Sequence, residues 1–246
     1  PVVGPNKDGK WCVDFYCGDV KGITDTMKYL KKLGVDIIYL CPISESQSNH
    51  RYDTADYKSV DPYAGTTDMM KEMCEKAHKY GIKIILDVVF DHTGNDSIYY
   101  NEFGHYDSIG AYQVAKVPEY KGQVSPYSDF YDTDCHFGKH EFKFWWNQPN
   151  MPKCNCNSKH WRKFICGVGG VIDFLFSLGI DGLRLDVADE LDDEFVEYIQ
   201  SASVRNKPDA FIIAEMWERD PMDRRYLKNA KGIHSLMNYR LTDAVM

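Results

Sequence analysis

The stretch GIDGLRLDVADE, residues 179–190, determines how the rest of the sequence is interpreted. Its centre alternates like a β-strand, with Leu183 and Leu185 on one face and Arg184 and Asp186 on the other. A strand face that carries an Arg and an Asp needs a shared polar cavity in a chain whose other strands look apolar. The C-terminal mouth of a (β/α)8 barrel, which is ringed by strand ends, supplies such a cavity.

The same local pattern occurs three times. A predicted helix runs up to Gly34, Gly81 or Gly179, and an apolar run rich in Ile, Leu and Val follows each glycine. Glycine at that point is typical of the left-handed residue that closes a helix. The first two apolar runs, at 35–40 and 82–86, predict parallel strands covered by helices on both faces. The first two helices carry apolar stripes, which are Ile23, Met27 and Leu30, and then Met70, Met73 and Ala77.

Further units follow along the chain. Strands are predicted at 210–215 and 235–238, with a helix at about 193–204. Repeated helix–strand units fit either an open doubly wound sheet or a (β/α)8 barrel. Three consecutive strand ends carry carboxylates, namely Asp87, Asp186 and Glu215, and this favours the barrel because its mouth gathers strand ends in one place.

One long insertion interrupts the repeat. The first two glycines are 47 residues apart (34 to 81) and the next two are 98 apart (81 to 179). The excess predicts an insertion at 93–157, after the second visible strand, rich in Tyr, Gly, Ser, Asn and Pro. The predicted organisation is therefore a first barrel part at 1–92, the insertion at 93–157 and a second barrel part at 158–246.

Bulk composition limits the function classes. The chain has 246 residues, 43% of them hydrophobic, and a net charge of −8, which gives no support to a nucleic-acid partner. No apolar run approaches the roughly 20 residues that span a bilayer, so no membrane association is expected. The eight cysteines are scattered, often in apolar contexts, and therefore favour a reducing cytoplasm over a disulfide framework.

Asp186 and Glu215 are the candidate catalytic pair, since they lie on strands that are consecutive in the chain. Two carboxyl groups about 5–5.5 Å apart across a glycosidic bond give retaining hydrolysis. Arg184 is expected to keep Asp186 ionised as the nucleophile. Glu215 is expected to have a raised pKa, as an acid needs, because its chain neighbours are apolar: Ile213, Ala214, Met216 and Trp217.

Three further side chains are candidates for sugar contacts. His92 could hydrogen-bond a hydroxyl group, and Tyr52 and Trp217 offer flat apolar faces on which pyranose rings pack. Each of them alone would more often be a core residue, so their assignment depends on the neighbouring acids.

Three blocks carry a family resemblance: DVVFDH at 87–92, GLRLDVADE at 182–190 and EMW at 215–217. In this order and spacing they resemble signature blocks of the alpha-amylase family, glycoside hydrolase family 13. HRYDTADY at 50–57, MPKCN at 151–155 and MNY at 237–239 resemble the group of neopullulanases, cyclomaltodextrinases and maltogenic amylases within it. The similarity covers nearly the whole chain.

The resemblance implies a function and a set of roles. Asp186 would be the nucleophile and Glu215 the general acid/base of a retaining α-glucan hydrolase that works through a glycosyl-enzyme intermediate. It would cleave α-1,4-glucosidic bonds, with α-1,6 bonds as a second candidate, in malto-oligosaccharides, cyclodextrins, pullulan or starch. The subsite under attack would be lined by Tyr52, His92 and Arg184, the leaving-group side by Glu190 and Trp217, and residues 93–157 would be domain B.

The sequence departs from the family pattern at three points. Asp91 stands where the first block usually has Asn, and Asp189 where this group usually has Asn. The family's block with a His-Asp pair has no match, and the chain resembles only the second to sixth barrel strands. We therefore expect an incomplete barrel from a longer enzyme, and weak or no activity from the isolated 246 residues.

Cofactors and assembly are also matters of resemblance. No cofactor or metal is expected to be required, although Asn6-Lys7-Asp8 and Gly18-Asp19 resemble a calcium loop of some relatives. A polar turn explains the same residues equally well. Relatives of this group often pair through an N-terminal domain, which implies a homodimer for the full-length protein.

Two other readings remain open from the residues alone. One is a metal-dependent barrel enzyme with Asp87, Asp186 and Glu215 as magnesium ligands, against which a guanidinium beside the carboxylates would compete. The other is a non-catalytic sugar-binding barrel, because a fold does not settle a function.

Overall fold

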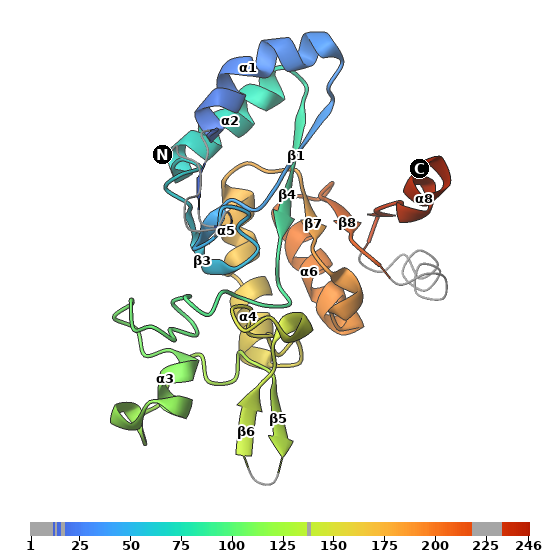
Figure 1. The fold of residues 1–246 in the computed structure, drawn as a ribbon. Coiled ribbons are helices and arrows are strands. Elements are labelled where there is room, and N and C mark those ends of the chain that lie inside the picture. Colours follow the sequence, from blue (N-terminus) through green and yellow to red (C-terminus); the bar gives the residue numbers. More distant parts are fainter. Residues whose placement is uncertain (1–11, 13, 16–17, 137–138, 218–232) are drawn as a thin grey trace.

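A five-stranded parallel sheet forms the centre of the molecule (Figure 1). The computed structural model describes all residues except 1–11, 13, 16–17, 137–138 and 218–232. The strand order is β1-β4-β7-β8-β9, and every neighbouring pair is parallel. The strands are β1 (Ile37–Leu40), β4 (Lys83–Val88), β7 (Gly182–Leu185), β8 (Phe211–Ala214) and β9 (Ser235–Leu236). All five lie where strands were predicted.

Helices lie between β1 and β4, between β4 and β7 and between β7 and β8, as a barrel arrangement requires. The helices of the barrel part are α1 (Val20–Leu33), α2 (Thr67–Lys79), α4 (Lys159–Cys166), α5 (Val171–Ser177), α6 (Asp193–Asn206) and α8 (Tyr239–Val245). The predicted stripes do face the core: Met27, Met70, Met73 and Ala77 are fully buried, and Ile23 and Leu30 partly so. The three glycines have the left-handed φ angles that the pattern predicted, +94° at Gly34, +66° at Gly81 and +96° at Gly179.

One expectation about the sheet was wrong. The strand after Gly34 was predicted to be covered on both faces, yet Ile37 and Tyr39 of β1 are about half exposed. β1 pairs only with β4 among the described strands, so it is an edge strand of the described sheet. An apolar run indicates burial on both faces only when the strand is internal, and the sequence does not reveal strand order.

The segment 93–157 leaves the barrel part after β4 and returns to it before α4. It contains α3 (Ala111–Lys116), a hairpin of β5 (Thr133–His136) and β6 (Lys139–Phe142), and short 3-10 turns at Pro118–Tyr120 and Trp145–Asn147. A second hairpin, β2 (Ser44–Ser46) with β3 (Thr54–Val60), follows β1. Buried aromatic rings from both parts meet, since Tyr57 packs edge-on against Trp161 and stacks on Tyr99.

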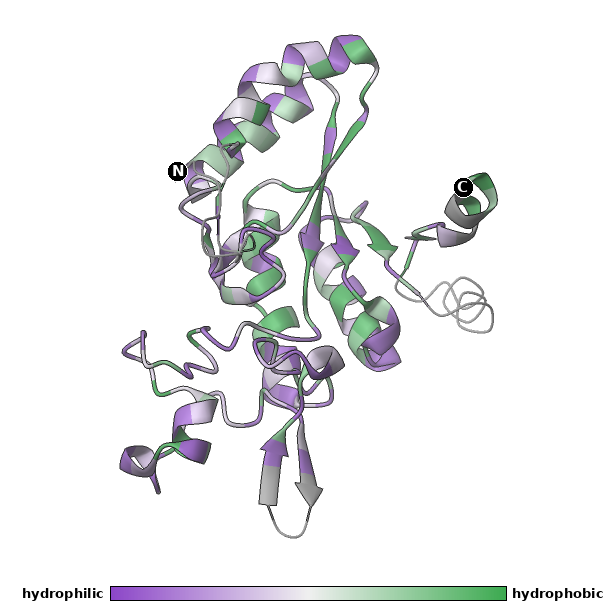
Figure 2. Cartoon of the chain, in the orientation of Figure 1, coloured by the Kyte–Doolittle hydropathy of each residue, from purple (hydrophilic) through white to green (hydrophobic). Residues whose placement is uncertain are grey.

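The distribution of hydropathy follows this arrangement. Figure 2 shows that α1 and α2 each carry hydrophilic and hydrophobic residues, as expected for helices with one face on a core. No helix among the described residues has the length and apolar character needed to cross a bilayer. The six cysteines whose state is described are free thiols.

Candidate active site

Arg184 is the centre of the candidate site. It lies on β7 directly opposite Asp87 of β4, and its side chain points into the space beyond the strand ends. Its Nη1 is 2.8 Å from Asp87 Oδ1 and 2.6 Å from Asp186 Oδ1, and its Nη2 is 2.8 Å from Glu215 Oε1. One buried guanidinium therefore contacts the carboxylates of three successive strand ends. The strand face that the sequence singled out does border a shared polar site.

Two tyrosines hold the Asp87 carboxylate from the other side. The hydroxyl groups of Tyr39 and Tyr52 both donate to Asp87 Oδ2, at 2.5 and 2.8 Å. Burial raises the pKa of Asp87, while Arg184 and the two hydroxyl donors oppose that rise. Asp87 is thus held in place by three short contacts, with Tyr39 of β1, Tyr52 of the β2–β3 hairpin and Arg184 of β7.

Glu215 follows β8 and is held by groups from two other elements. Tyr239, at the start of α8, donates its hydroxyl proton to Glu215 Oε1 at 2.6 Å, and the Val187 amide donates to Oε2 at 3.0 Å. Val187 has a left-handed φ of +39°, a conformation that costs a β-branched residue about 1–3 kcal/mol. This turn leads from β7 into a 3-10 turn at Ala188–Glu190 and aims the amide at the carboxylate.

Asp186 and Glu215 share one counter-charge. Arg184 Nη1 is 2.6 Å from Asp186 Oδ1, and Arg184 Nη2 is 2.8 Å from Glu215 Oε1. The two carboxyl groups therefore lie beside the same guanidinium, and both line the same cavity.

The protonation pattern is the reverse of the expected one. Burial raises the pKa of Asp186 to about 8, with Arg184 opposing the rise and Asp87 and Glu215 adding to it. Burial also acts to raise the pKa of Glu215, but the Tyr239 hydroxyl, the Val187 amide and Arg184 together lower it. The expectation of an ionised Asp186 beside a high-pKa Glu215 was thus wrong for the unliganded site. The apolar chain neighbours of Glu215 mattered less than donors that come from distant segments.

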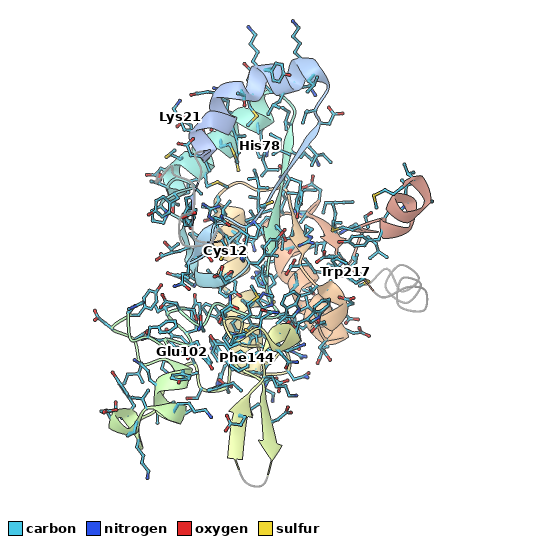
Figure 3. All side chains as sticks on the ribbon, in the orientation of Figure 1. Cys12, Lys21, His78, Glu102, Phe144 and Trp217 are labelled. Carbon is cyan, nitrogen blue, oxygen red and sulfur yellow. The ribbon has the colours of Figure 1, made fainter. Side chains whose placement is uncertain are left out.

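A cavity of about 580 Å³ lies over this cluster. All seven site residues predicted from the sequence line it, namely Tyr52, His92, Arg184, Asp186, Glu190, Glu215 and Trp217. The remaining lining residues are His50, Trp145, Trp146, Met151, Val187 and Asp189. Trp217, labelled in Figure 3, follows β8 and stacks on Tyr239 with ring centroids 5.0 Å apart. Trp145, Trp146 and Met151 lie near the end of segment 93–157, so this segment also forms part of the cavity wall.

His92 and Glu190 differ in how free they are to bind a ligand. His92 is almost fully buried and stacks on Trp145 at 5.2 Å, and neither ring nitrogen has a hydrogen-bond partner among the described residues. It is therefore available to a ligand hydroxyl group. Glu190 is already engaged, since Oε1 accepts from Trp146 Nε1 at 3.2 Å and Oε2 is 2.5 Å from Lys153 Nζ.

Several residues of the site received no role from the sequence. Tyr39 and Tyr239 are held against acidic partners by tertiary contacts. Tyr239 ends the MNY block at 237–239, but nothing in that block identifies Glu215 as its partner. His50 lies two positions before the predicted Tyr52, and its Nδ1 accepts a hydrogen bond from the Tyr52 amide at 3.1 Å. The adjacent Trp145 and Trp146, in an insertion rich in polar residues, were the one sequence signal that could have been noticed.

Metal binding finds little support in these side chains. Across the described ranges, no group of three or more His, Cys, Asp and Glu side chains is arranged to hold a metal ion. Arg184 occupies the point between Asp87, Asp186 and Glu215 at which a shared cation would bind. For the calcium loop, Asp19 serves as the N-cap of α1 by accepting the Gly22 amide, and Asn6-Lys7-Asp8 lie outside the described residues.

Comparison with known proteins identifies the family. The profile described as "Alpha amylase, catalytic domain" matches residues 5–246. The chain belongs to the alpha-amylase catalytic-domain family. The family resemblance and the (β/α)8-barrel fold class predicted from the three blocks are thereby confirmed, with the described sheet as part of such a barrel.

Relatives within the alpha-amylase family fall in the predicted group and extend it. An amylopullulanase of Thermoanaerobacterium saccharolyticum is 38% identical over 99% of the chain, and a cyclomaltodextrinase of Geobacillus thermopakistaniensis is 34% identical over all of it. The type III pullulan hydrolase from Thermococcus kodakarensis superposes with a TM-score of 0.77 at 31% identity, over 96% of this chain and 38% of that one. The chain spans 19% of the amylopullulanase and 40% of the cyclomaltodextrinase.

Proposed function

We propose that this chain carries the catalytic pair of a retaining α-glucan hydrolase. The observation that carries the proposal is the Arg184 guanidinium, which contacts Asp87, Asp186 and Glu215 and lines one cavity together with Asp186 and Glu215. The substrates would be malto-oligosaccharides, cyclodextrins, pullulan or starch, cleaved at α-1,4-glucosidic bonds, because relatives are named cyclomaltodextrinase, neopullulanase and amylopullulanase.

The reaction proceeds in two balanced steps. Asp186 attacks the anomeric carbon as a carboxylate, while Glu215 gives its proton to the departing glycosidic oxygen. Glu215 then removes a proton from water, whose oxygen displaces Asp186 and restores both groups. Before the first step, Glu215 has to carry the proton, and Asp186 has to be ionised beside Arg184, whose Nη1 is 2.6 Å from Asp186 Oδ1.

Substrate tests address the proposal at the level of the whole enzyme. The enzyme expressed from its complete reading frame should hydrolyse maltotriose and at least one of β-cyclodextrin, pullulan and soluble starch, with release of the α-anomer. Product configuration can be followed by proton NMR within the first minutes, before mutarotation. Release of the β-anomer would contradict the retaining mechanism, and binding of these sugars without hydrolysis would favour a sugar-binding barrel.

The pH dependence of kcat/KM tests the shared proton. Because burial raises the pKa of Asp186 to about 8, the coupled pair keeps one proton below this pH and loses it above. We expect kcat/KM for maltotriose to fall as the pH rises through about 8, since two ionised carboxylates leave no acid. α-Maltosyl fluoride, whose leaving group needs no proton, should show a weaker decline. An unchanged kcat/KM for maltotriose well above this pH would contradict the assignment.

A further inference from the structure

The end of the 93–157 segment runs along the end of β4. The Cys154 amide donates to the Asp91 carbonyl oxygen at 2.6 Å, and the Thr93 amide donates to the Pro152 carbonyl oxygen at 3.2 Å. Lys153 lies between these two bonds, in an isolated antiparallel bridge with His92. The backbone therefore fixes Lys153 at the seam between the insertion and the barrel part.

The Lys153 ammonium group links both sides of that seam. Its Nζ is 2.5 Å from Glu190 Oε2, in the turn after β7, and 3.4 Å from Asp91 Oδ1, after β4. Asp91 is completely buried, and its two oxygens have no hydrogen-bond partner among the described residues. Burial acts to lower the pKa of Lys153, but the charges of Asp91 and Glu190 raise it, so the ammonium stays protonated.

This pairing accounts for one departure from the family pattern. A buried carboxylate without a counter-charge is strongly destabilising. Asp91, where the resembling block has Asn, brings such a charge, and Lys153 brings the opposite one. The extra negative charge at Asp91 is therefore balanced from within the chain.

Glu190 connects Lys153 to the cavity wall through Trp146. Its second oxygen accepts from Trp146 Nε1, and the Trp146 ring stacks on Trp145, with centroids 5.3 Å apart and ring planes 16° apart. Trp146 has a strained φ of +46°, and its side chain is 67% exposed where it lines the cavity. Lys153 itself is not among the lining residues. Its influence on a ligand is therefore indirect, and Glu190 and Trp146 provide a side-chain route.

We propose that Lys153 is a positioning residue. Its ammonium group pairs with Asp91 and Glu190, and Glu190, held in this way, fixes the Trp146 indole as a platform for the leaving-group sugar. The leaving group lies on the side of the proposed acid, Glu215. Trp217 follows Glu215 by two residues, and its amide donates to Asp189, the chain neighbour of Glu190. An exposed indole face in this wall suits the apolar face of a pyranose ring. This inference rests on the proposed function.

The decisive variant is Lys153→Met, assayed on two substrates that differ only on the leaving-group side. Maltotriose places a sugar there, and α-maltosyl fluoride places only fluoride, which departs without a proton. We expect kcat/KM for maltotriose to fall roughly ten- to a hundredfold through misplacement of the platform, and that for α-maltosyl fluoride to stay near the wild-type value. Trp146→Ala should reproduce this split, and Lys153→Arg should retain much of the maltotriose activity.

A second substitution separates positioning from stability. Lys153→Met removes the ammonium counter-charge of the buried Asp91 and leaves it with the His92 ring, whose Nδ1 is 3.6 Å from Asp91 Oδ2. The melting temperature should therefore fall, and adding Asp91→Asn should restore most of it. The loss of maltotriose activity should persist in the double variant, because Glu190 still lacks its ion pair with Lys153. Lys143→Met is the matched control, since Lys143 also contacts two carboxylates, those of Asp132 and Asp134 at 3.1 Å, but on the surface.

The outcomes are distinct. Equal losses on both substrates, or recovery of maltotriose activity together with the melting temperature, would show that Lys153 is only structural and overturn the inference. A Lys153→Met variant that matches Lys143→Met in every measurement would overturn it as well. If the wild-type enzyme cleaves neither substrate, the proposed function fails, whatever Lys153 does. In that case, additive melting-temperature shifts of Lys153→Met and Asp91→Asn would show that the two residues do not interact and would overturn the inference.

Discussion

Replacing Asp186 by Asn is expected to lower kcat for maltotriose by roughly four orders of magnitude or more, as loss of a catalytic nucleophile does. The amide keeps the size of the carboxyl group but cannot form the glycosyl ester. Arg184 retains two carboxylate partners, Asp87 and Glu215, so the fold should remain intact. Because Asp186 is a buried carboxyl group with a raised pKa, its removal should leave the melting temperature unchanged or raise it.

Sugar binding provides the control for this variant. Calorimetric titration with a malto-oligosaccharide should still show binding to Asp186→Asn, since His92, Tyr52 and the tryptophans remain. Hydrolysis at a rate close to that of the wild type would mean that another group is the nucleophile.

Arg184→Met is expected to have the largest effect on stability. It leaves Asp87, Asp186 and Glu215 without their common counter-charge, and breaking a buried pair in this way costs about 3–5 kcal/mol. Activity should be lost too, since the repelled carboxylates can no longer hold their places. The free energy of unfolding can be measured by urea titration.

The pH dependence of this loss has a definite sign. Burial raises the pKa values of Asp87 and Asp186, so both take up protons as the pH falls, and the uncompensated charge disappears. The destabilisation by Arg184→Met should therefore be greatest above about pH 8, where Asp186 is ionised, and shrink as the pH falls through this value. Arg205→Met is the matched control, because Arg205 pairs with Asp173 at the surface and should contribute at most about 1 kcal/mol. Equal losses in the two variants would contradict the central role of Arg184.

Local sequence patterns were sufficient to predict the barrel strands and the site that they support. The alternation around Arg184 and Asp186 reflects a physical constraint, since two opposite charges on a strand face require a polar space. The three glycines were equally informative, because left-handed backbone at a helix end excludes most other residues. Carboxylates at consecutive strand ends converge wherever parallel strands end at one edge, and Asp87, Asp186 and Glu215 do so here.

Properties set by contacts between distant segments could not be predicted in this way. The pKa of Glu215 depends on Tyr239 and on the strained Val187 amide, neither of which is recognisable as a partner from its own neighbourhood. The exposure of β1 depends on strand order. The roles of Lys153 and Trp146 depend on how a long insertion folds back onto the barrel, and the register of that return has no periodic signal.

The most direct test of the whole account is to trap the glycosyl-enzyme. A fluorinated maltosyl fluoride that glycosylates the enzyme quickly and is hydrolysed slowly should label one peptide, and tandem mass spectrometry locates the ester. The account predicts a single maltosyl ester on the Asp186 carboxyl group, and no label in Asp186→Asn. An ester on Asp87 or Glu215 instead, or catalysis with inversion and no ester at all, would contradict it.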